Sequence, residues 1–372
     1  MLLSNPATDD IRPLKEARAL TSHGFRVMIL AWDRERSSPR ESLYADGVII
    51  RRFKVSGGYG QHIGVVVGFV LYYVWCLYQS ASLSFRAVHC HDVDTLPLGI
   101  ILKLTRFGKV RLVYDMHDLP EVFLGHFPLS TALVSAAMSL ARSFPDRVLV
   151  VNDSFVGYLG GLGFDADRLC VIMNVPALDE GAESAHRRES VEMNILYYGD
   201  MDETRGVKEL VAAAANSKSV SLLLAGRGSL DPWLKTVCLS TANIKCLGWV
   251  PVEKLAPLTR RADLIPSLYY PTSPNQRLAT PGKLFTALSL GIPALVPQGC
   301  CQAELVTEYD CGLAVGSRNA AEVGQAIERL CHDRELYIRL GVNALEAFRE
   351  RFNWEVMERR LAALYEQLTT SI

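Results

Sequence analysis

The residues with the most distinctive chemistry lie in the segment 279–293, where the pattern predicts a short helix with its amino end open to an anion. Thr280 is expected to be the N-cap and Pro281 the first helical residue, a position where a missing N–H costs nothing. Gly282 leaves room for a ligand, and Lys283 adds a positive charge to the first turn. Unpaired amides, helix dipole and lysine together predict a phosphate or diphosphate site, although an ordinary well-capped surface helix has the same pattern.

Other loops of the second half follow predicted strands and carry glycines or cations. Gly199 ends one strand, and Arg205 then stands at the start of a predicted helix, another place that favours an anion. A turn with a solvated arginine is the plainer interpretation. Gly226 opens a Gly-x-Gly loop that lets a backbone or a ligand approach closely, which alone is weak evidence. Val250 and Lys254 border a tryptophan-containing turn that offers a flat apolar wall to a nucleotide base.

Histidines and aspartates follow two predicted strands in the first half, and a polar loop opens the first helix at the same sheet edge. Three interpretations stay open for them: side chains that face a cleft, a metal centre, or structural hydrogen bonding. The spacing matches no common zinc pattern. The candidate residues at this edge are Asn5, Asp10, Arg12, His91, Asp92 and His117.

The elements that position these residues alternate between apolar runs and helix-periodic runs, which predicts parallel sheets covered by helices. Both halves are expected to be doubly wound α/β domains with ligands at the carboxyl ends of strands. We expect strands at 1–4, 26–32, 47–53, 87–90, 110–114, 147–151, 168–172, 194–198, 220–225, 244–247, 264–268 and 294–297. We expect helices at 13–22, 63–82, 96–106, 129–142 and 207–215.

Length and composition narrow the class of protein. The 372 residues suit two domains, with the polar run 177–192 as the linker and a site expected in the cleft between them. Lysine plus arginine, 39, nearly balance aspartate plus glutamate, 40, so no long-range field recruits nucleic acid. The nine cysteines form no CxxC pair, which is typical of a reducing compartment without a structural metal. The start of the sequence lacks the apolar run of a signal peptide, so we expect a cytoplasmic protein.

One segment is more apolar than is usual for a helix of a soluble protein. Residues 63–77 are almost wholly apolar, and no charged residue occurs between Lys54 and Arg86. A membrane span, a buried helix and a helix lying on a membrane surface are the three interpretations. The aromatic side chains within and next to the segment favour the membrane interface. Peripheral membrane contact through Ile63 to Leu77 is therefore a hypothesis for this chain.

Taken together, these motifs resemble the retaining GT-B glycosyltransferases of family four, the glycosyl transferases group 1. The resemblance covers nearly the whole chain and depends on the order of the motifs more than on any single one. The matching segments are Ser4-Asn5-Pro6 with Asp10, Arg12 and Glu16, His89 to Asp92, Val113 to Asp118, Val171 to Pro176, Tyr198-Gly199 with Arg205-Gly206, Leu224 to Gly226, Leu247 to Val250, and Pro281 to Phe285.

The resemblance implies a fold and a set of roles. The fold is GT-B, with two Rossmann-like doubly wound domains facing a cleft: residues 1–176 for the acceptor, 193–352 for the nucleotide sugar, and a last helix within 353–372 that crosses back to the first domain. His117 would lie beside the reacting sugar, and Arg205 and Lys283 would neutralise the leaving diphosphate. Donor-binding residues would be Gly199, Gly226, Val250, Lys254, Thr280, Gly282, Leu284 and Thr286. Acceptor-side residues would be Asn5, Asp10, Arg12, His91 and Asp92.

The implied reaction is glycosyl transfer from a UDP-sugar or GDP-sugar, without a cofactor or metal. The acceptor would be a cell-envelope, lipid-linked or polysaccharide precursor, and the departing phosphate oxygen would take the proton of the attacking hydroxyl. No protein base is then needed, and positioning and charge stabilisation remain for the protein to supply. A non-catalytic protein of this fold that binds a sugar nucleotide or a partner enzyme is the alternative, and a sugar-nucleotide epimerase is a third class.

Three positions depart from the family pattern. Thr286 and Leu278 stand where the family usually has glutamates, one of which binds the ribose hydroxyls, and Asp200 replaces a common phosphate-binding arginine. Each lost contact is expected to weaken donor binding by roughly 1 to 3 kcal/mol. The first strand is also shorter than the family's, so it is either clipped or begins upstream.

Overall fold

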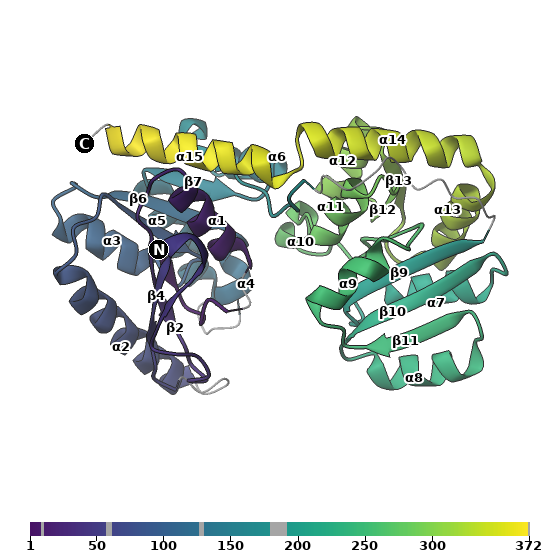
Figure 1. Cartoon of the computed structure of the whole chain (residues 1–372), viewed down its shortest axis with the longest axis horizontal. Coiled ribbons are helices and arrows are strands. Elements are labelled where there is room, and N and C mark those ends of the chain that lie inside the picture. Colours follow the sequence, from purple (N-terminus) through teal and green to yellow (C-terminus); the bar gives the residue numbers. More distant parts are fainter. Residues whose placement is uncertain (9–10, 57–61, 126–129, 179–191, 371–372) are drawn as a thin grey trace. The chain divides into compact units, whose positions relative to one another are not determined.

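The computed structural model describes residues 1–8, 11–56, 62–125, 130–178 and 192–370. The chain divides into two compact units (Figure 1). Unit 1 comprises Met1–Met173 together with Met357–Ile372, and unit 2 comprises Asn174–Val356. Most of the predicted linker 177–192 lies outside the described residues.

Unit 1 is built on an eight-stranded sheet with the order β3-β4-β2-β1-β5-β6-β7-β8, parallel except for the edge pair β3 and β4. Its strands are β1 Leu2–Leu3, β2 Met28–Trp32, β3 Glu41–Leu43, β4 Ile49–Phe53, β5 Ala87–His91, β6 Arg111–Met116, β7 Arg147–Val150 and β8 Leu169–Val171. Its helices are α1 Ile11–Ser22, α2 His62–Ala81, α3 Leu96–Thr105, α4 Pro120–Leu124, α5 Ser130–Ser143, α6 Asp153–Gly161 and nearly all of α15 Trp354–Thr370, with short 3₁₀ turns at Ala45–Gly47 and Ala166–Arg168.

The strand order of unit 1 determines where a ligand can approach the sheet. From β1 the chain passes outward to β2 on one side, while β5 pairs with β1 on the other side. This reversal is a topological switch point, and in open α/β sheets ligands bind at the carboxyl ends of the strands beside it. The loops after β1, β5 and β6 therefore form the expected binding edge of this unit.

Unit 2 contains a three-stranded parallel sheet, β11-β10-β9, and a parallel pair, β12-β13. One hydrophobic core joins residues of both, among them Ile195, Leu222 and Leu295. The strands are β9 Met193–Asp200, β10 Val220–Arg227, β11 Ile244–Gly248, β12 Ala294–Pro297 and β13 Gly312–Val315. The helices are α7 Val207–Ala215, α8 Asp231–Ser240, α9 Val252–Thr259, α10 Pro274–Leu278, α11 Gly282–Ser289, α12 Cys301–Glu308, α13 Ala320–His332 and α14 Arg334–Glu350.

Two features of the secondary structure differ from the sequence prediction. The strand expected at 264–268 is wrong: the segment makes a single parallel bridge, between Leu264 and Ile195. Pro266 follows two residues later and has no N–H to donate to a ladder, which accounts for the interruption. The strands β3 and β13 were not predicted, because both are short and β3 carries the polar residues of an exposed edge.

Helix α2 presents two different faces. A stripe at intervals of four residues, Gly68, Tyr72 and Cys76, is buried against the sheet, and a Cβ on Gly68 would come within 2.5 Å of the Trp32 ring. Among the described parts of the chain no helix, α2 included, is long and apolar enough to cross a membrane. The outward face is nevertheless apolar and exposed, at Val66, Val67, Val70, Leu71, Val74 and Tyr78.

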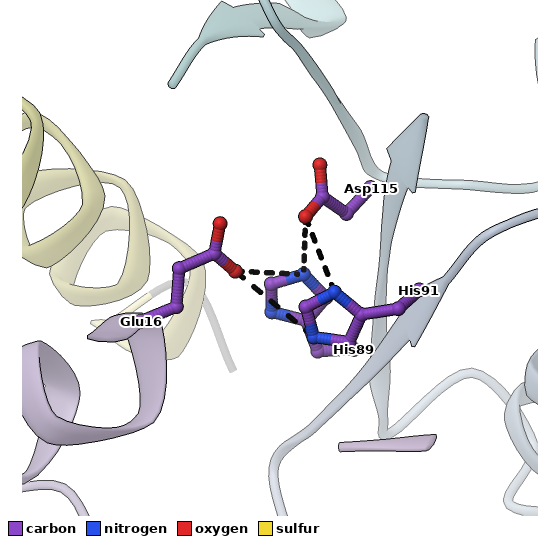
Figure 2. Close-up of side chains that lie close together, drawn as sticks. All are labelled: Glu16, His89, His91 and Asp115. Carbon is purple, nitrogen blue, oxygen red and sulfur yellow. Dashed lines mark ion pairs between the residues drawn. The ribbon is translucent and has the colours of Figure 1, made fainter. Parts of the chain in front are cut away.

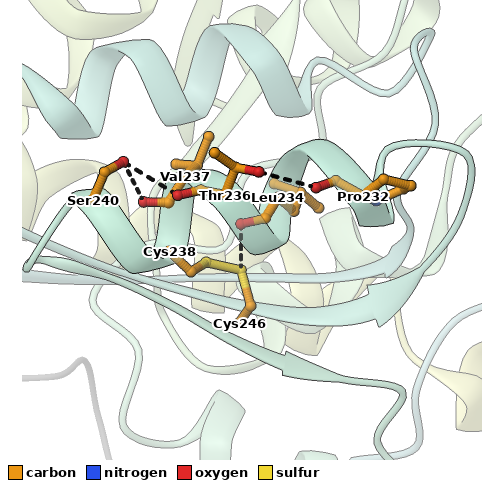
Figure 3. Close-up of a disulfide and its surroundings, with 7 residues drawn as sticks. All are labelled: Pro232, Leu234, Thr236, Val237, Cys238, Ser240 and Cys246. Carbon is orange, nitrogen blue, oxygen red and sulfur yellow. Dashed lines mark hydrogen bonds between the residues drawn. A yellow bond between two sulfur atoms is a disulfide. The ribbon is translucent and has the colours of Figure 1, made fainter.

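A disulfide between Cys238 and Cys246 joins α8 to the edge strand β11 (Figure 3). The sequence argument from cysteine spacing did not anticipate this pair, because the two residues come together only when α8 packs on β11. Other cysteines, such as the buried Cys76 and Cys90, are free thiols.

Candidate functional site

Three predicted site residues lie at the switch point of unit 1. Asn5 follows β1 and folds back on its own loop, its side-chain oxygen accepting from Ala7 N at 2.9 Å. Asp92 follows β5 with a left-handed φ of 64°. His117 follows β6, and its Nδ1 lies 3.9 Å from Asp92 Oδ1. The side chains of Asp92 and His117 are about one fifth exposed, so they can meet a ligand at this edge.

Below this edge lies a buried network of charged and aromatic side chains. Arg12, from α1, donates to both oxygens of Asp115 at 2.9 and 2.7 Å, and to the Ile172 carbonyl at 2.6 Å. Its Nε also lies 3.1 Å from Glu16 Oε1. His117 Nε2 lies 2.6 Å from Asp115 Oδ2, which connects the network to the exposed edge.

Two stacked histidines complete the network between Glu16 and Asp115, as Figure 2 shows. The rings of His89 and His91 lie 4.3 Å apart, and His91 Nδ1 is 3.2 Å from Asp115 Oδ2. His89 Nδ1 pairs with the Tyr365 hydroxyl of α15 at 2.8 Å, so this helix belongs to the same packing unit.

Burial and charge set the protonation of this network. Burial alone would raise the pKa of Asp115, but the Arg12 guanidinium and then His117 lower it well below its usual range. Burial lowers the pKa of His117, yet the Asp115 carboxylate outweighs burial and raises the pKa to about 9. Burial also lowers the pKa of His91, which favours its neutral form. His117 is therefore the protonated histidine at neutral pH.

The donor set of this network also fits a divalent metal. Ligand atoms of Glu16, His89, His91 and Asp115 all lie within 4.8 Å of one another. However, Arg12 occupies both oxygens of Asp115 and already supplies positive charge where a metal would bring it. Of the three interpretations left open by the sequence, this geometry favours structural hydrogen bonding for the buried members.

Two predicted acceptor-side residues need correction. Arg12 is 4% exposed and His91 is 3% exposed, and the contacts described above use both side chains within unit 1. The expectation that they face an acceptor is wrong, because α1 and β5 direct them into the core. Asp10, the remaining acceptor-side prediction, lies outside the described residues.

In unit 2 the two predicted phosphate-binding cations converge at the end of β9. Lys283, in the first turn of α11, has its Nζ 3.9 Å from the centroid of the Tyr197 ring. The same Nζ would lie 3.7 Å from a Cβ placed on Gly199, which has a φ of 113°. Arg205 bonds Asp200 at 3.2 Å, in an ion pair that is largely exposed. The aspartate that replaces the family's arginine thus partly neutralises Arg205.

The electrostatic state of Lys283 is unusual for a lysine. Burial and then the positive charge of Arg205 lower its pKa to about 7, although Asp200 opposes this. Desolvation and a second cation destabilise the charged form of this lysine, so an anion that binds beside it stabilises that form strongly. Lys283 and Arg205 are therefore two neighbouring cations that a bound anion would stabilise.

The amino end of α11 agrees with the prediction in part. Pro281, not Thr280, is the N-cap, with extended φ and ψ of −61° and 144°, so the helix begins at Gly282, one residue later than expected. A Cβ on Gly282 would meet no atom within 4 Å, which leaves that end open. Leu284 is a further correction: its amide donates to the Pro281 carbonyl at 3.0 Å, and its side chain is fully buried.

The remaining donor-side candidates serve different purposes. Gly226 is required by close packing, because a Cβ there would come within 1.8 Å of the Gly199 carbonyl oxygen. Val250 packs partly on a hydrophobic cluster, while Lys254 is exposed on α9. Thr286 turns back on its own helix, donating to the Gly282 carbonyl at 3.0 Å.

Two residues in these sites received no role from sequence reasoning. Asp115 joins the buried network to His117, and its signal was a carboxylate within the apolar run that follows Arg111 in β6. Tyr197 provides the ring under Lys283, and its hydroxyl donates to the Asp200 carbonyl at 3.0 Å. An aromatic residue in a buried strand carries no comparable signal.

Solved structures of similar architecture identify the fold. Sucrose-phosphate synthase from Thermosynechococcus elongatus superimposes with a TM-score of 0.78 at 19% identity, covering 100% of this chain and 99% of that one. Anabaena HepE in complex with UDP-glucose superimposes with a TM-score of 0.73 at 16% identity, covering 98% of both chains. The fold is thus the two-domain α/β fold of GT-B glycosyltransferases.

Sequence comparison places both units within glycosyltransferase families. Residues 12–174 match the glycosyl transferase 4-like domain, and residues 192–333 match glycosyl transferases group 1. A relative, the D-inositol 3-phosphate glycosyltransferase of Corynebacterium efficiens, is 24% identical over 325 residues, which are 79% of this chain and 74% of that protein. The chain is a glycosyltransferase that belongs to these two domain families.

Proposed function

We propose that this glycosyltransferase moves a hexosyl group from a UDP-sugar or GDP-sugar to a cell-envelope, lipid-linked or polysaccharide acceptor, with retention. The observation that carries the proposal is the convergence of Lys283 and Arg205 at the end of β9, beside the open amino end of α11. Such a site binds a diphosphate and stabilises the charge that develops as it leaves. The solved complex of HepE with UDP-glucose supports a nucleotide sugar as the donor class.

In the proposed reaction the acceptor hydroxyl attacks the anomeric carbon as the bond to the diphosphate breaks. The departing phosphate oxygen takes the hydroxyl proton, so the charges balance without a protein base. His117 is protonated, since its pKa is raised to about 9, and its Nδ1 can donate to a sugar oxygen. Its role is then to position the sugar rather than to remove a proton.

Titration calorimetry of the full chain with UDP, GDP and their common sugar conjugates tests the function. We expect at least one nucleotide sugar to bind and to be consumed when a glycan or lipid-linked acceptor extract is added. Absence of binding to every conjugate at millimolar concentration contradicts the donor proposal. Binding without transfer to any acceptor favours the non-catalytic alternative.

Thr286→Glu is expected to tighten binding of the selected nucleotide about tenfold, because a carboxylate on this turn of α11 can accept both ribose hydroxyls. The present hydroxyl is already used by the Gly282 carbonyl. Calorimetry with the nucleoside diphosphate measures the gain, and Thr286→Gln keeps the size without the charge. Equal affinities for all three proteins would mean that the ribose lies elsewhere.

We further propose that the exposed face of α2 rests on a lipid bilayer. The 20 residues of α2 include no Lys, Arg, Asp or Glu, and its outward valines are more than half exposed. Arg106 caps the end of the helix by donating to the Ser80 carbonyl at 2.6 Å. Arg86, in the loop after α2, and Lys109, in the loop after α3, are exposed. An apolar face beside cations suits an anionic membrane surface.

Val70→Asp with Val74→Asp is expected to lower the fraction of protein that floats with anionic liposomes by about tenfold, because both side chains are exposed and their burial in lipid would be lost. Val342→Asp, at an exposed valine of α14 in unit 2, is the matched control. Tyr73 is unsuitable for this test, since its hydroxyl donates to the Asp94 carbonyl. Equal flotation of all variants removes the membrane from the proposal.

A further inference from the structure

A cavity of about 440 Å³ opens in unit 1 at the amino ends of β6, β7 and β8. This is the sheet edge opposite the strand ends that carry Asp92 and His117. Arg111 and Arg147, the first residues of β6 and β7, line it together with Lys103 from the last turn of α3. It is therefore separate from the edge at which the proposed transfer takes place.

Two of the four cations of this cavity, Lys103 and Arg111, share the carboxylate of Asp146. Asp146 Oδ2 lies 2.6 Å from Lys103 Nζ, and its Oδ1 lies 3.4 Å from Arg111 Nη1. Arg147 donates to the backbone carbonyl of Asp146 at 2.9 Å. Arg168, the fourth cation of the lining, makes a 3.5 Å ion pair with Asp165, and both side chains are about half exposed. Solvent screening makes such an exposed pair weak.

The charges of the cavity do not cancel. Its four cations face the carboxylate of Asp146, the half-exposed carboxylate of Asp165 and the carboxyl ends of α3 and α5, each of which contributes about half a negative charge. Asp146 is ionised, because the Leu112 amide and the Lys103 ammonium lower its pKa although burial opposes them. Roughly one positive charge remains uncompensated around a cavity of ligand size.

We infer that this cavity binds a phosphate monoester. A phosphate monoester carries about −1.5 to −2 charges at neutral pH, so the surplus of positive charge favours its binding, and arginine forks fit its oxygens in bidentate geometry. A lone phosphate leaves most of 440 Å³ unfilled, so the cavity also accommodates the organic group that bears it. Phe144 and the buried Leu368 supply apolar wall for that group.

The inference is independent of the proposed transfer reaction, and the test keeps the two apart. Glycerol 3-phosphate is titrated into the full chain in the presence of saturating UDP, so that the donor site is already filled, with glycerol as the uncharged comparison. We expect glycerol 3-phosphate to bind and to raise Tm, and glycerol to do neither. If neither compound gives a heat of binding or raises Tm at about 10 mM, the inference is overturned.

Variants locate the binding within the molecule. Arg147→Gln with Arg168→Gln is expected to weaken glycerol 3-phosphate binding by tenfold or more, because two charge-assisted contacts are lost. Arg26→Gln with Arg142→Gln removes the same charge from exposed positions of unit 1 outside the cavity and should leave the affinity within about twofold. UDP binding is expected to be unchanged in both. Equal losses in the two double variants would mean nonspecific attraction and would overturn the inference.

Vesicles distinguish a soluble ligand from a lipid headgroup of the same chemistry. The vesicle test is made in the Val70→Asp, Val74→Asp background, so that the face of α2 does not contribute to membrane binding. Cosedimentation with phosphatidic acid vesicles, but not phosphatidylcholine vesicles, that is lost when Arg147→Gln and Arg168→Gln are added assigns a lipid phosphate monoester. Binding of glycerol 3-phosphate without a preference between the two vesicles assigns a soluble one. Both outcomes place the phosphate in the cavity.

Discussion

Lys283→Ala is expected to lower kcat/KM for the nucleotide sugar by about 10²- to 10³-fold, the usual loss when one preorganised stabiliser of developing charge is removed. Lys283 and Arg205 are the two cations at the end of β9, and Asp200 already weakens the second. Most of the stabilisation of the leaving diphosphate should therefore depend on the lysine. Steady-state transfer with the donor selected by calorimetry measures the effect.

Measuring Tm beside transfer distinguishes an effect of the substitution on folding from an effect on catalysis. Lys283 is desolvated and repelled by Arg205, so its removal should leave Tm unchanged or raise it. Lys235→Ala, at an exposed lysine of α8 in the same unit, should leave both Tm and transfer unchanged. A loss of transfer accompanied by an equal loss in Lys235→Ala would argue against the assigned role.

The lowered pKa of Lys283 also gives donor binding a defined pH dependence. With a pKa of about 7 in the free protein, Lys283 is mostly neutral at pH 8, whereas a bound diphosphate favours the ammonium. Binding at pH 8 should take up close to one proton, and affinity should weaken as pH rises through 7. Lys283→Arg remains charged, so it should bind without proton uptake in paired buffers of different ionisation enthalpy.

The sequence predicted most of the sheet because buried parallel strands are continuous apolar runs. The range 220–225 lies within β10, and the helix expected at 207–215 has the bounds of α7. The failures have local causes. Pro266 interrupts the strand expected at 264–268, and the polar Glu41–Leu43 forms an edge strand only because β4 offers it a partner.

The candidate sites were predictable to the extent that they depend on strand-end position. Residues such as Asp92 and His117 follow strands and lie at the switch point, so spacing alone located them. Whether a side chain points into the core or outward depends on packing across long separations. Arg12 and Asp115 are 103 residues apart in the sequence, and their pairing could not be predicted because it depends on how α1 lies against β6.

Arg12→Ala is expected to lower the free energy of unfolding of unit 1 by about 3 to 5 kcal/mol. The variant leaves the buried carboxylate of Asp115 without its guanidinium and the Ile172 carbonyl without its donor. It also leaves the buried carboxyl group of Glu16, whose pKa burial and then Asp115 raise to about 8, without its neighbouring cation. Removing one partner of a buried ion pair costs more than the pair itself contributes, because the remaining charge stays desolvated. Differential scanning calorimetry should show a fall in Tm on the order of 10 °C for the transition of this unit.

Arg18→Ala provides the matched control on the same helix. Arg18 of α1 pairs with Asp46 at 2.8 Å, but both side chains are about half exposed, so its removal should cost less than about 1 kcal/mol. The difference in the free energy of unfolding between the two variants measures the effect of burial, since the helix, the residue type and the ion-pair chemistry are the same. A similar small loss in both would mean that water reaches Asp115. The network would then not hold His117 in its protonated form, and the positioning role proposed for this histidine would fail with it.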